Sequence, residues 1–397
     1  MNAQPPRPAF AGWLSETNDI TARFLAAGGV PCLINLAGGL PAPETYPGEA
    51  VAALAAEAAR ESAETLAYGP IHGLPALRDA VAARFSTPEM ALGRENVLIT
   101  TAGMQGLSLV GQVLIEPGQV VACQSPAYLG ALDAWRPRRP AWRPIFPERN
   151  GFDAEASLSG AQFGYVVPNF SNPTGRLVGL ERRRELAAAA EATGTWLVED
   201  DPYGALYYDS EPLPRILSLS GALRPGPYRG PVVYLGTFSK EIAPGLRIGW
   251  AIAAPEMIAA LAAAKQGADM CTSPLTQKIA LRALETRLPE AIRPGLLALY
   301  AKRRDALAAA MATHLPDVFD WEVPVGGMFL WATAKDPAFD TDRLFEAGLE
   351  AGVCVTPGRV FDPLGEDRRS IRLNFTLNDE AKLEEGVRRL AKAARGM

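Results

Sequence analysis

The chain has 397 residues, a net charge of −5 and a pI near 5.4. It therefore lacks the broad basic field that holds a phosphate backbone, which argues against nucleic acid as a partner. Hydrophobic residues make up 48% and charged residues 21% of the chain, which excludes a mostly disordered protein.

Short β-branched or apolar runs alternate with alanine-rich helical segments from about residue 50 to 290. This alternation predicts an α/β core with a mostly parallel sheet and crossover helices. Most of the runs are fully apolar, as strands buried on both faces must be. The predicted strands are 96–100, 119–122, 164–167, 196–199, 232–235 and 248–251, and the predicted helices between them include 180–192 and 255–267.

The pattern changes after Pro289 to one long helical stretch that ends near His314. Strands near 328–332 and 371–375 follow it, which indicates a smaller α+β domain. We therefore predict three parts, consistent with a chain too long for one compact core. They are an N-terminal arm with part of the small domain (1–45), a large domain (46–288) and a C-terminal small domain (289–397).

The four cysteines, Cys32, Cys123, Cys271 and Cys354, are far apart and show no zinc-ligand spacing, so we expect no metal site. Reduced thiols in a cytoplasmic protein fit this cysteine pattern best. No apolar run is long enough to span a membrane, and no secretion signal is recognisable at the N-terminus. The basic aromatic stretch 135–143 is interrupted by prolines and is expected to be a solvated connection.

Lys240 is the first lysine from the N-terminus and stands just beyond a predicted strand. Parallel α/β sheets bind ligands outside the carboxyl ends of their strands. A lysine attacks an aldehyde only when its amine is neutral, and desolvation or a cationic neighbour favours that state. Arg247 is a nearby cation that can balance a phosphate. Taken alone, the segment fits a surface lysine better.

Three other motifs also follow predicted strands. The acidic run 199–201 contains carboxylates that suit a metal, a ribose hydroxyl or a protonated ring nitrogen, and Tyr203 adds a hydroxyl. Asn172 offers an amide from a tight turn. Gly103 begins a helix whose free N–H groups suit a phosphate. Ordinary turns and a plain helix start are the alternatives for each motif by itself.

In this order and spacing, the four motifs closely resemble the fold-type I enzymes that use pyridoxal 5′-phosphate (PLP), specifically class I/II aminotransferases. The resemblance covers nearly the whole chain, from 35–41 to 371–375. The segments 37–41 (AGGLP), 199–204 (EDDPYG), 238–250 (FSKEIAPGLRIGW) and 326–331 (GGMFLW) are similar to the 2-aminoadipate and kynurenine aminotransferase group. The resemblance implies the aspartate aminotransferase-like fold. It also implies transfer of an amino group from an L-amino acid to a 2-oxo acid, with 2-oxoglutarate expected as the acceptor.

The resemblance implies a role for each matching residue. Lys240 holds PLP as a Schiff base and then moves a proton between the substrate Cα and the cofactor. Asp200 pairs with the pyridinium nitrogen, which keeps the ring an electron sink. Asn172 and Tyr203 hydrogen-bond its phenolic oxygen, and Tyr128 stacks on the ring face.

The family's phosphate site also carries over, with one departure. Relatives usually have Ser-Gln after the glycine, but here Met104 replaces the serine, so one hydroxyl donor is missing. Tyr68 resembles the tyrosine that reaches the partner subunit's phosphate, which implies a homodimer with shared sites. The implied phosphate ligands are Gly103, Met104, Gln105, Thr237, Ser239, Arg247 and Tyr68.

For the substrate, the resemblance implies that Arg372 clamps the α-carboxylate bidentately, helped by Asn172, with Gly39 close by. The donor amino acid is left open. Arg23 is a candidate for binding a distal carboxylate, and an ordinary exposed arginine is the alternative. The region around Leu40 and 328–329 is another place where the distal group could be selected.

Three other functions are alternatives to an aminotransferase. A PLP-dependent lyase or decarboxylase on the same fold differs only in which bond breaks. A ligand-sensing, aminotransferase-like regulator would need a DNA-binding domain, and about forty residues before Gly38 leave no room for one. A nicotinamide dehydrogenase would need GxGxxG after the first strand. His72 and His314, the two histidines, give little support for histidine-centred hydrolysis or metal catalysis.

Overall fold

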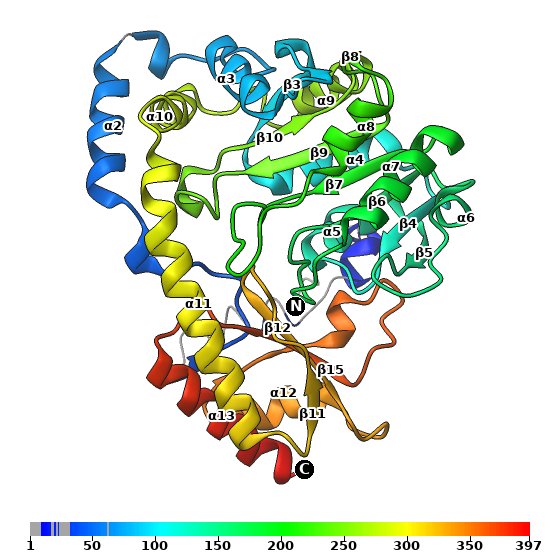
Figure 1. Ribbon diagram of the computed structural model, residues 1–397, viewed down its shortest axis with the longest axis vertical. Coiled ribbons are helices and arrows are strands. Elements are labelled where there is room, and N and C mark those ends of the chain that lie inside the picture. The colour runs from blue at the N-terminus through cyan, green and yellow to red at the C-terminus, as the bar shows by residue number, and fades with distance from the viewer. Residues whose placement is uncertain (1–8, 17–19, 21–22, 24–31, 62) are drawn as a thin grey trace, which may run out of the picture.

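A seven-stranded sheet lies at the centre of the larger part of the molecule (Figure 1). The computed structural model describes residues 9–16, 20, 23, 32–61 and 63–397. The strand order is β3-β10-β9-β7-β6-β4-β5, and all neighbours are parallel except β10, which is antiparallel to both β3 and β9. The strands are β3 (Val97–Thr100), β4 (Val120–Gln124), β5 (Ala141–Ile145), β6 (Phe163–Val166), β7 (Trp196–Asp200), β9 (Val232–Thr237) and β10 (Gly249–Ile252).

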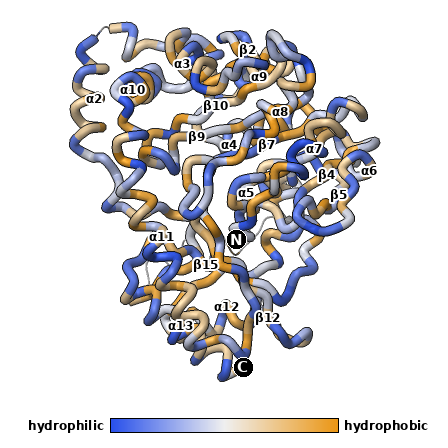
Figure 2. The backbone as a smooth tube through the Cα atoms, in the orientation of Figure 1, coloured by the Kyte–Doolittle hydropathy of each residue, from blue (hydrophilic) through white to orange (hydrophobic). Residues whose placement is uncertain are grey.

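The sheet is covered on both faces, which explains why its strands are apolar throughout. Leu98 belongs to one hydrophobic cluster, whereas its neighbours Val97 and Ile99 belong to another, so alternate side chains enter two separate cores. Hydrophobic residues gather along these strands (Figure 2). The helices of this part are α2 (Gly48–Glu61), α3 (Pro75–Phe85), α4 (Ala102–Leu114), α5 (Leu129–Trp135), α6 (Ala154–Leu158), α7 (Leu180–Thr193), α8 (Ile216–Leu223), α9 (Pro255–Ala268) and α10 (Pro274–Glu285).

A four-stranded antiparallel sheet, in the order β11-β12-β15-β14, forms the smaller part. The long helix α11 runs from the large sheet's region to this one and packs against α13 (Figure 1). The elements of the smaller part are α11 (Leu288–His314), β11 (Phe319–Trp321), β12 (Phe329–Ala334), α12 (Thr341–Glu350), β14 (Thr356–Pro357), β15 (Ser370–Asn374) and α13 (Glu380–Arg395).

Two short parallel pairs complete the described strands. In the first, β1 (Ile34–Asn35) pairs with β13 (Val353–Cys354), which joins the early chain to the smaller part. In the second, β2 (Met90–Ala91) pairs with β8 (Gly226–Pro227). No helix in the described part of the chain is long and apolar enough to cross a membrane.

The predicted α/β class and mostly parallel sheet are confirmed, and each predicted strand of the core lies within two residues of an observed one. The prediction for residues 135–143 was wrong. Instead of a solvated connection, the stretch includes the start of edge strand β5, and Trp135 is fully buried against Tyr165. An edge strand tolerates both the basic side chains and Pro144, because one side of it has no partner strand.

Candidate active site

A cavity of about 310 Å³ lies where the ends of β6, β7 and β9 meet the start of α4 and strand β15 of the small sheet. This is the carboxyl edge of the parallel strands, where α/β folds bind ligands. The predicted site residues that line it are Gly39, Gly103, Met104, Tyr128, Asn172, Asp200, Tyr203, Thr237, Ser239, Lys240, Arg247 and Arg372.

Lys240 lies in the turn that follows β9, and its side chain enters the cavity. Its Nζ donates a hydrogen bond to the carbonyl oxygen of Gly39 at 2.8 Å. Burial, together with the charges of Arg372 and Arg247, lowers the pKa of Lys240 to about 8. The amine is therefore neutral more often at neutral pH than that of an ordinary lysine, and a nucleophile toward an aldehyde requires the neutral form.

Asp200 is the last residue of β7 and lines the cavity at 6% exposure. Its Oδ2 accepts a hydrogen bond from the Tyr165 hydroxyl at 2.9 Å. Burial raises the pKa of Asp200 to about 7, against the lowering effect of the Tyr165 hydrogen bond. A buried carboxylate of this kind is stabilised by a cationic partner, and a protonated ring nitrogen is one.

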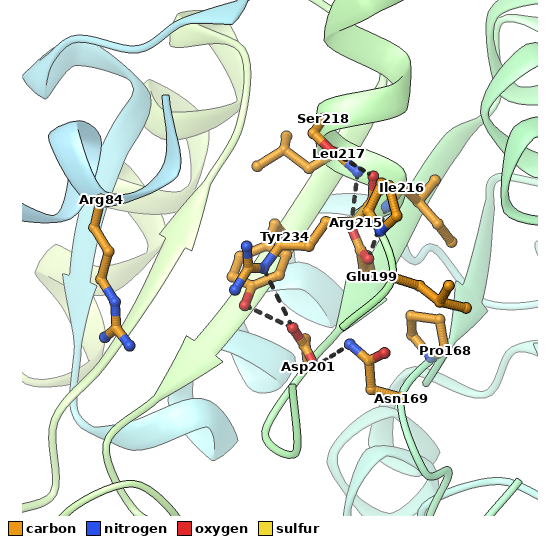
Figure 3. A network of polar contacts seen from close by, with 12 residues as sticks. Arg84, Pro168, Asn169, Glu199, Asp201, Arg215, Ile216, Leu217, Ser218 and Tyr234 are labelled. Carbon is orange, nitrogen blue, oxygen red and sulfur yellow. Dashed lines mark hydrogen bonds and ion pairs between the residues drawn. The ribbon is translucent and has the colours of Figure 1, made fainter. Parts of the chain in front are cut away.

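The two neighbouring carboxylates anchor the end of β7 instead of lining the cavity (Figure 3). Glu199 accepts hydrogen bonds at 2.9 and 2.8 Å from the first two amides of α8. Asp201 accepts from Asn169 Nδ2 at 2.7 Å and from the Tyr234 hydroxyl at 2.9 Å. The pleat of the strand therefore separates Asp200 from the other two acids.

Asn172 connects a tyrosine to an arginine at the centre of the site. Its Nδ2 donates to the Tyr203 hydroxyl oxygen at 3.3 Å, and its Oδ1 accepts from Arg372 Nη1 at 2.7 Å. Burial raises the pKa of Tyr203 above its usual range. Tyr203 therefore keeps its proton at neutral pH and can donate a hydrogen bond into the cavity.

Arg372 is buried, and its guanidinium carbon lies 4.4 Å from the ring centroid of Phe329 and 4.7 Å from that of Phe361. Its Nη2 donates to the carbonyl of Ala37, and its Nε has no hydrogen-bond partner. Burial lowers the pKa of Arg372 to about 10. Among the residues that the structure describes, no carboxylate forms an ion pair with it. A ligand anion would supply the missing partner.

Several other residues that line the cavity carry hydrogen-bond donors. Gly103 and Met104 lie in the first turn of helix α4, where backbone amides have no partner within the helix. Thr237 Oγ1 lies 2.9 Å from Ser239 Oγ. Arg247 forms no ion pair within the described residues and also lines the cavity. This set of amides, hydroxyls and a guanidinium suits a phosphate.

Three predicted site residues do not line the cavity. The Oε1 of Gln105 accepts a hydrogen bond from Lys265 behind the helix start. Tyr68 is 86% exposed on the surface of the chain. Arg23 forms an ion pair of 2.5 Å with Glu346 on α12.

Some features in and around the cavity could not be predicted from the sequence. Tyr165 reaches Asp200 from within β6, where the sequence shows only a core aromatic. Ile20, Leu129 and Val360 form an apolar wall, and they come from segments far apart in the chain. No sequence motif contains these residues, because their convergence depends on tertiary packing.

The donors present fit PLP. Amides, hydroxyls and a guanidinium that suit a phosphate line the same cavity as a buried carboxylate on β7 and a lysine with a lowered pKa. The unpartnered Nε of Arg372 leaves a cationic donor in the same site for a second anion. Within the described part of the chain, no group of three or more histidine, cysteine or acidic residues is placed to hold a metal ion.

Comparisons with known proteins agree with this geometry. Residues 33–390 match the family described as aminotransferase class I and II. The chain is 36% identical to aromatic-amino-acid aminotransferase 1 of Thermococcus litoralis, over 91% of this chain and 87% of that protein. Kynurenine aminotransferase of Pyrococcus horikoshii has a similar structure, with a TM-score of 0.88, 32% identity and coverage of 98% and 97%. The α-aminoadipate aminotransferase of Thermus thermophilus, bound to N-(5′-phosphopyridoxyl)-L-leucine, has a TM-score of 0.85, 33% identity and coverage of 97% and 99%.

The chain therefore belongs to the class I and II aminotransferase family. It is a PLP-dependent aminotransferase with the aspartate aminotransferase-like fold. This finding confirms the predicted family, fold, cofactor and enzyme class.

Proposed function

We propose that this aminotransferase moves the amino group of an apolar L-amino acid to 2-oxoglutarate, with Lys240 as the catalytic base. The observation that carries the proposal is the position of Lys240 Nζ in a cavity with a buried acid and two arginines that lack ion pairs among the described residues. Its lowered pKa suits both covalent attachment and proton transfer.

PLP, when bound, supplies an aldehyde and a ring that accepts electrons. Lys240 would accept the proton from the substrate Cα and would donate it again as the amino group is transferred. Asp200 keeps a proton on the ring nitrogen, because a buried carboxylate favours a cationic neighbour. Tyr203 and Asn172 would donate hydrogen bonds to the phenolic oxygen, and Tyr128 would cover the ring face.

The phosphate is proposed to bind at the start of α4. The backbone amides of Gly103 and Met104 donate to it, as do the hydroxyls of Thr237 and Ser239, and Arg247 neutralises its charge. The Gln105 side chain supports this helix start from behind, as its hydrogen bonds indicate. Because Met104 supplies no hydroxyl, its backbone amide is its contribution.

Arg372 is proposed to bind the α-carboxylate that donor and acceptor share, with Asn172 holding its guanidinium and Gly39 beside it. The wall made by Ile20, Leu129 and Val360 then faces the rest of the substrate. Apolar groups on this wall favour donors such as leucine or phenylalanine over glutamate or 2-aminoadipate. The Arg23 side chain pairs with Glu346 and does not line the cavity.

A homodimer is proposed from the surface around Tyr68. Leu66, Tyr68 and Met270 are exposed apolar or aromatic side chains, and the Gly69 amide donates to Cys271 Sγ at 3.4 Å, which brings their two loops together. Exposed apolar groups gathered in this way are typical of subunit interfaces. Tyr68 would reach the partner's phosphate. Sedimentation equilibrium should give a dimer, and a monomer would contradict it.

The division at residues 45 and 288 also remains a proposal, as does a cytoplasmic location. The strands of the large sheet all lie between residues 97 and 252, and the pairing of β1 with β13 attaches the early chain to the smaller part. The four cysteines are free thiols, which suits a reducing compartment.

The substrate proposal is tested by a panel of amino donors with 2-oxoglutarate, read by glutamate formation. Leucine and phenylalanine should give higher kcat/KM than 2-aminoadipate and aspartate. A preference for acidic donors would contradict the apolar wall, and no glutamate from any donor would contradict the acceptor.

A further inference from the structure

Lys265 is a fully buried lysine that does not line the cavity. It lies on α9, and its Nζ donates to both carboxylate oxygens of Asp269 at 2.7 and 2.8 Å. Nζ also donates to Thr272 Oγ1 at 3.0 Å. A buried ammonium is costly unless it is paired and hydrogen-bonded, so this arrangement is well satisfied and held in one position.

The same Nζ donates to Gln105 Oε1 at 2.7 Å, which connects α9 to the start of α4. Gln105 Oε1 also accepts a hydrogen bond from the backbone amide of Thr101 at 2.8 Å. The Thr101 hydroxyl in turn donates to Asp269 Oδ2 at 2.9 Å. The network therefore holds both the side chain and the backbone of the residue that precedes α4.

The backbone at this point needs such support. Ala102 has a φ of +62°, in the left-handed region that a residue with a Cβ rarely adopts. On its other side, Gly249 of β10 packs so closely that an added Cβ would lie 2.7 Å from the Ala102 carbonyl carbon and 2.9 Å from the Gly103 nitrogen. The turn is thus fixed between β10 and the Lys265 network.

We propose that Lys265 is a positioning residue for the cofactor phosphate, acting through Gln105 and Thr101. Through these two residues it keeps the amides of Gly103 and Met104 directed into the cavity. Donors must be held within about 0.5 Å of their productive positions to contribute fully. The proposal rests on the phosphate position given under Proposed function. Asp269 balances the lysine's charge, so the role of Lys265 is geometric.

The experiment compares PLP with pyridoxal, which lacks the phosphate. Apoenzyme is titrated with each compound, and the absorbance of the Schiff base on Lys240 gives two dissociation constants. Their ratio, pyridoxal over PLP, measures what the phosphate contributes. The variants are Lys265→Met and Gln105→Met. Lys278→Met is the matched control, because Lys278 forms an ion pair with Glu61 on α2 instead.

Lys265→Met should lower the ratio about tenfold or more, as supporting residues of a ligand site typically do. Gln105→Met removes the same link without leaving a buried charge alone, and should lower the ratio in the same direction. Lys278→Met should leave it unchanged. If circular dichroism shows that Lys265→Met does not fold, the ratio measured for Gln105→Met tests the proposal instead.

Arg247→Ala separates failure of this inference from failure of the phosphate site. If it lowers the ratio while Lys265→Met and Gln105→Met do not, the role of Lys265 is overturned and the site stands. Equal weakening of PLP and pyridoxal in Lys265→Met would also overturn it, because a general structural defect does not distinguish the two. If Arg247→Ala leaves the ratio unchanged as well, the phosphate position itself is wrong.

Discussion

Arg372 Nη1 donates a hydrogen bond of 2.7 Å to Asn172 Oδ1, although the two residues are 200 positions apart. Arg372 belongs to β15 of the small sheet, and Asn172 lies in the turn after β6 of the large one. The proposed α-carboxylate site is therefore assembled where the two sheets meet. Asn172 also donates a hydrogen bond to the Tyr203 hydroxyl, so the same amide contacts a residue of the proposed substrate site and one of the proposed cofactor site.

Arg372→Ala should reduce kcat/KM for every donor by roughly a hundredfold or more, because each donor has the α-carboxylate that loses its charged contact. Steady-state kinetics with leucine, phenylalanine and glutamate would measure it. The expected signature is a similar factor for all three donors. A loss confined to one of them would place the α-carboxylate elsewhere.

Asp200→Asn should cut kcat by roughly two orders of magnitude or more, because an amide stabilises a protonated ring nitrogen poorly. Asp201→Asn is the matched control and should mainly lower the free energy of unfolding, by about 1–3 kcal/mol, since Asp201 holds Asn169 and Tyr234. Turnover and urea unfolding of both variants test this assignment. The reverse pattern would identify Asp201 as the acid that faces the cofactor.

The attachment of PLP to apoenzyme should accelerate with pH, with a midpoint near 8 instead of the ordinary lysine value of 10.5. The amine reacts when neutral, and burial with two neighbouring cations lowers the pKa of Lys240. Arg372→Ala removes one cation, so its midpoint should move to higher pH. Stopped-flow absorbance over a pH series gives both midpoints. An unchanged or lower midpoint in the variant would show that Arg372 does not act on Lys240.

Leu129→Ala should lower kcat/KM for leucine and phenylalanine about tenfold while affecting alanine little, because the wall then loses apolar contact with large side chains. Arg23→Ala should leave the ratio of glutamate to leucine activity unchanged, since Arg23 pairs with Glu346. The donor panel measures both variants. A selective loss of glutamate and 2-aminoadipate in Arg23→Ala would return Arg23 to the distal-carboxylate role considered from the sequence.

Much of the site was predictable because its residues follow strands closely. Lys240, Asp200 and Asn172 each stand at or soon after the end of a parallel strand, and such ends meet at one edge of a sheet. The antiparallel direction of β10 was not apparent, because a buried strand is equally apolar in either direction.

Contacts between distant side chains could not be predicted in the same way. In the sequence, Lys265 is an ordinary cation within an alanine-rich helix. Its hydrogen-bond partner Gln105 lies 160 residues earlier. Arg23 shows the converse case. Its type suited a distal carboxylate, but whether it faces the cavity or α12 depends on how its segment packs.

The central claim is amino transfer through PLP on Lys240, and a half-reaction with donor alone tests it most directly. Holoenzyme mixed with leucine or phenylalanine, without a 2-oxo acid, should release one equivalent of the corresponding 2-oxo acid per subunit and then stop. It should resume when 2-oxoglutarate is added, and Lys240→Ala should do neither. Continuous release of ammonia or carbon dioxide from the donor alone would instead show a lyase or decarboxylase. Full activity in Lys240→Ala would contradict the account at its centre.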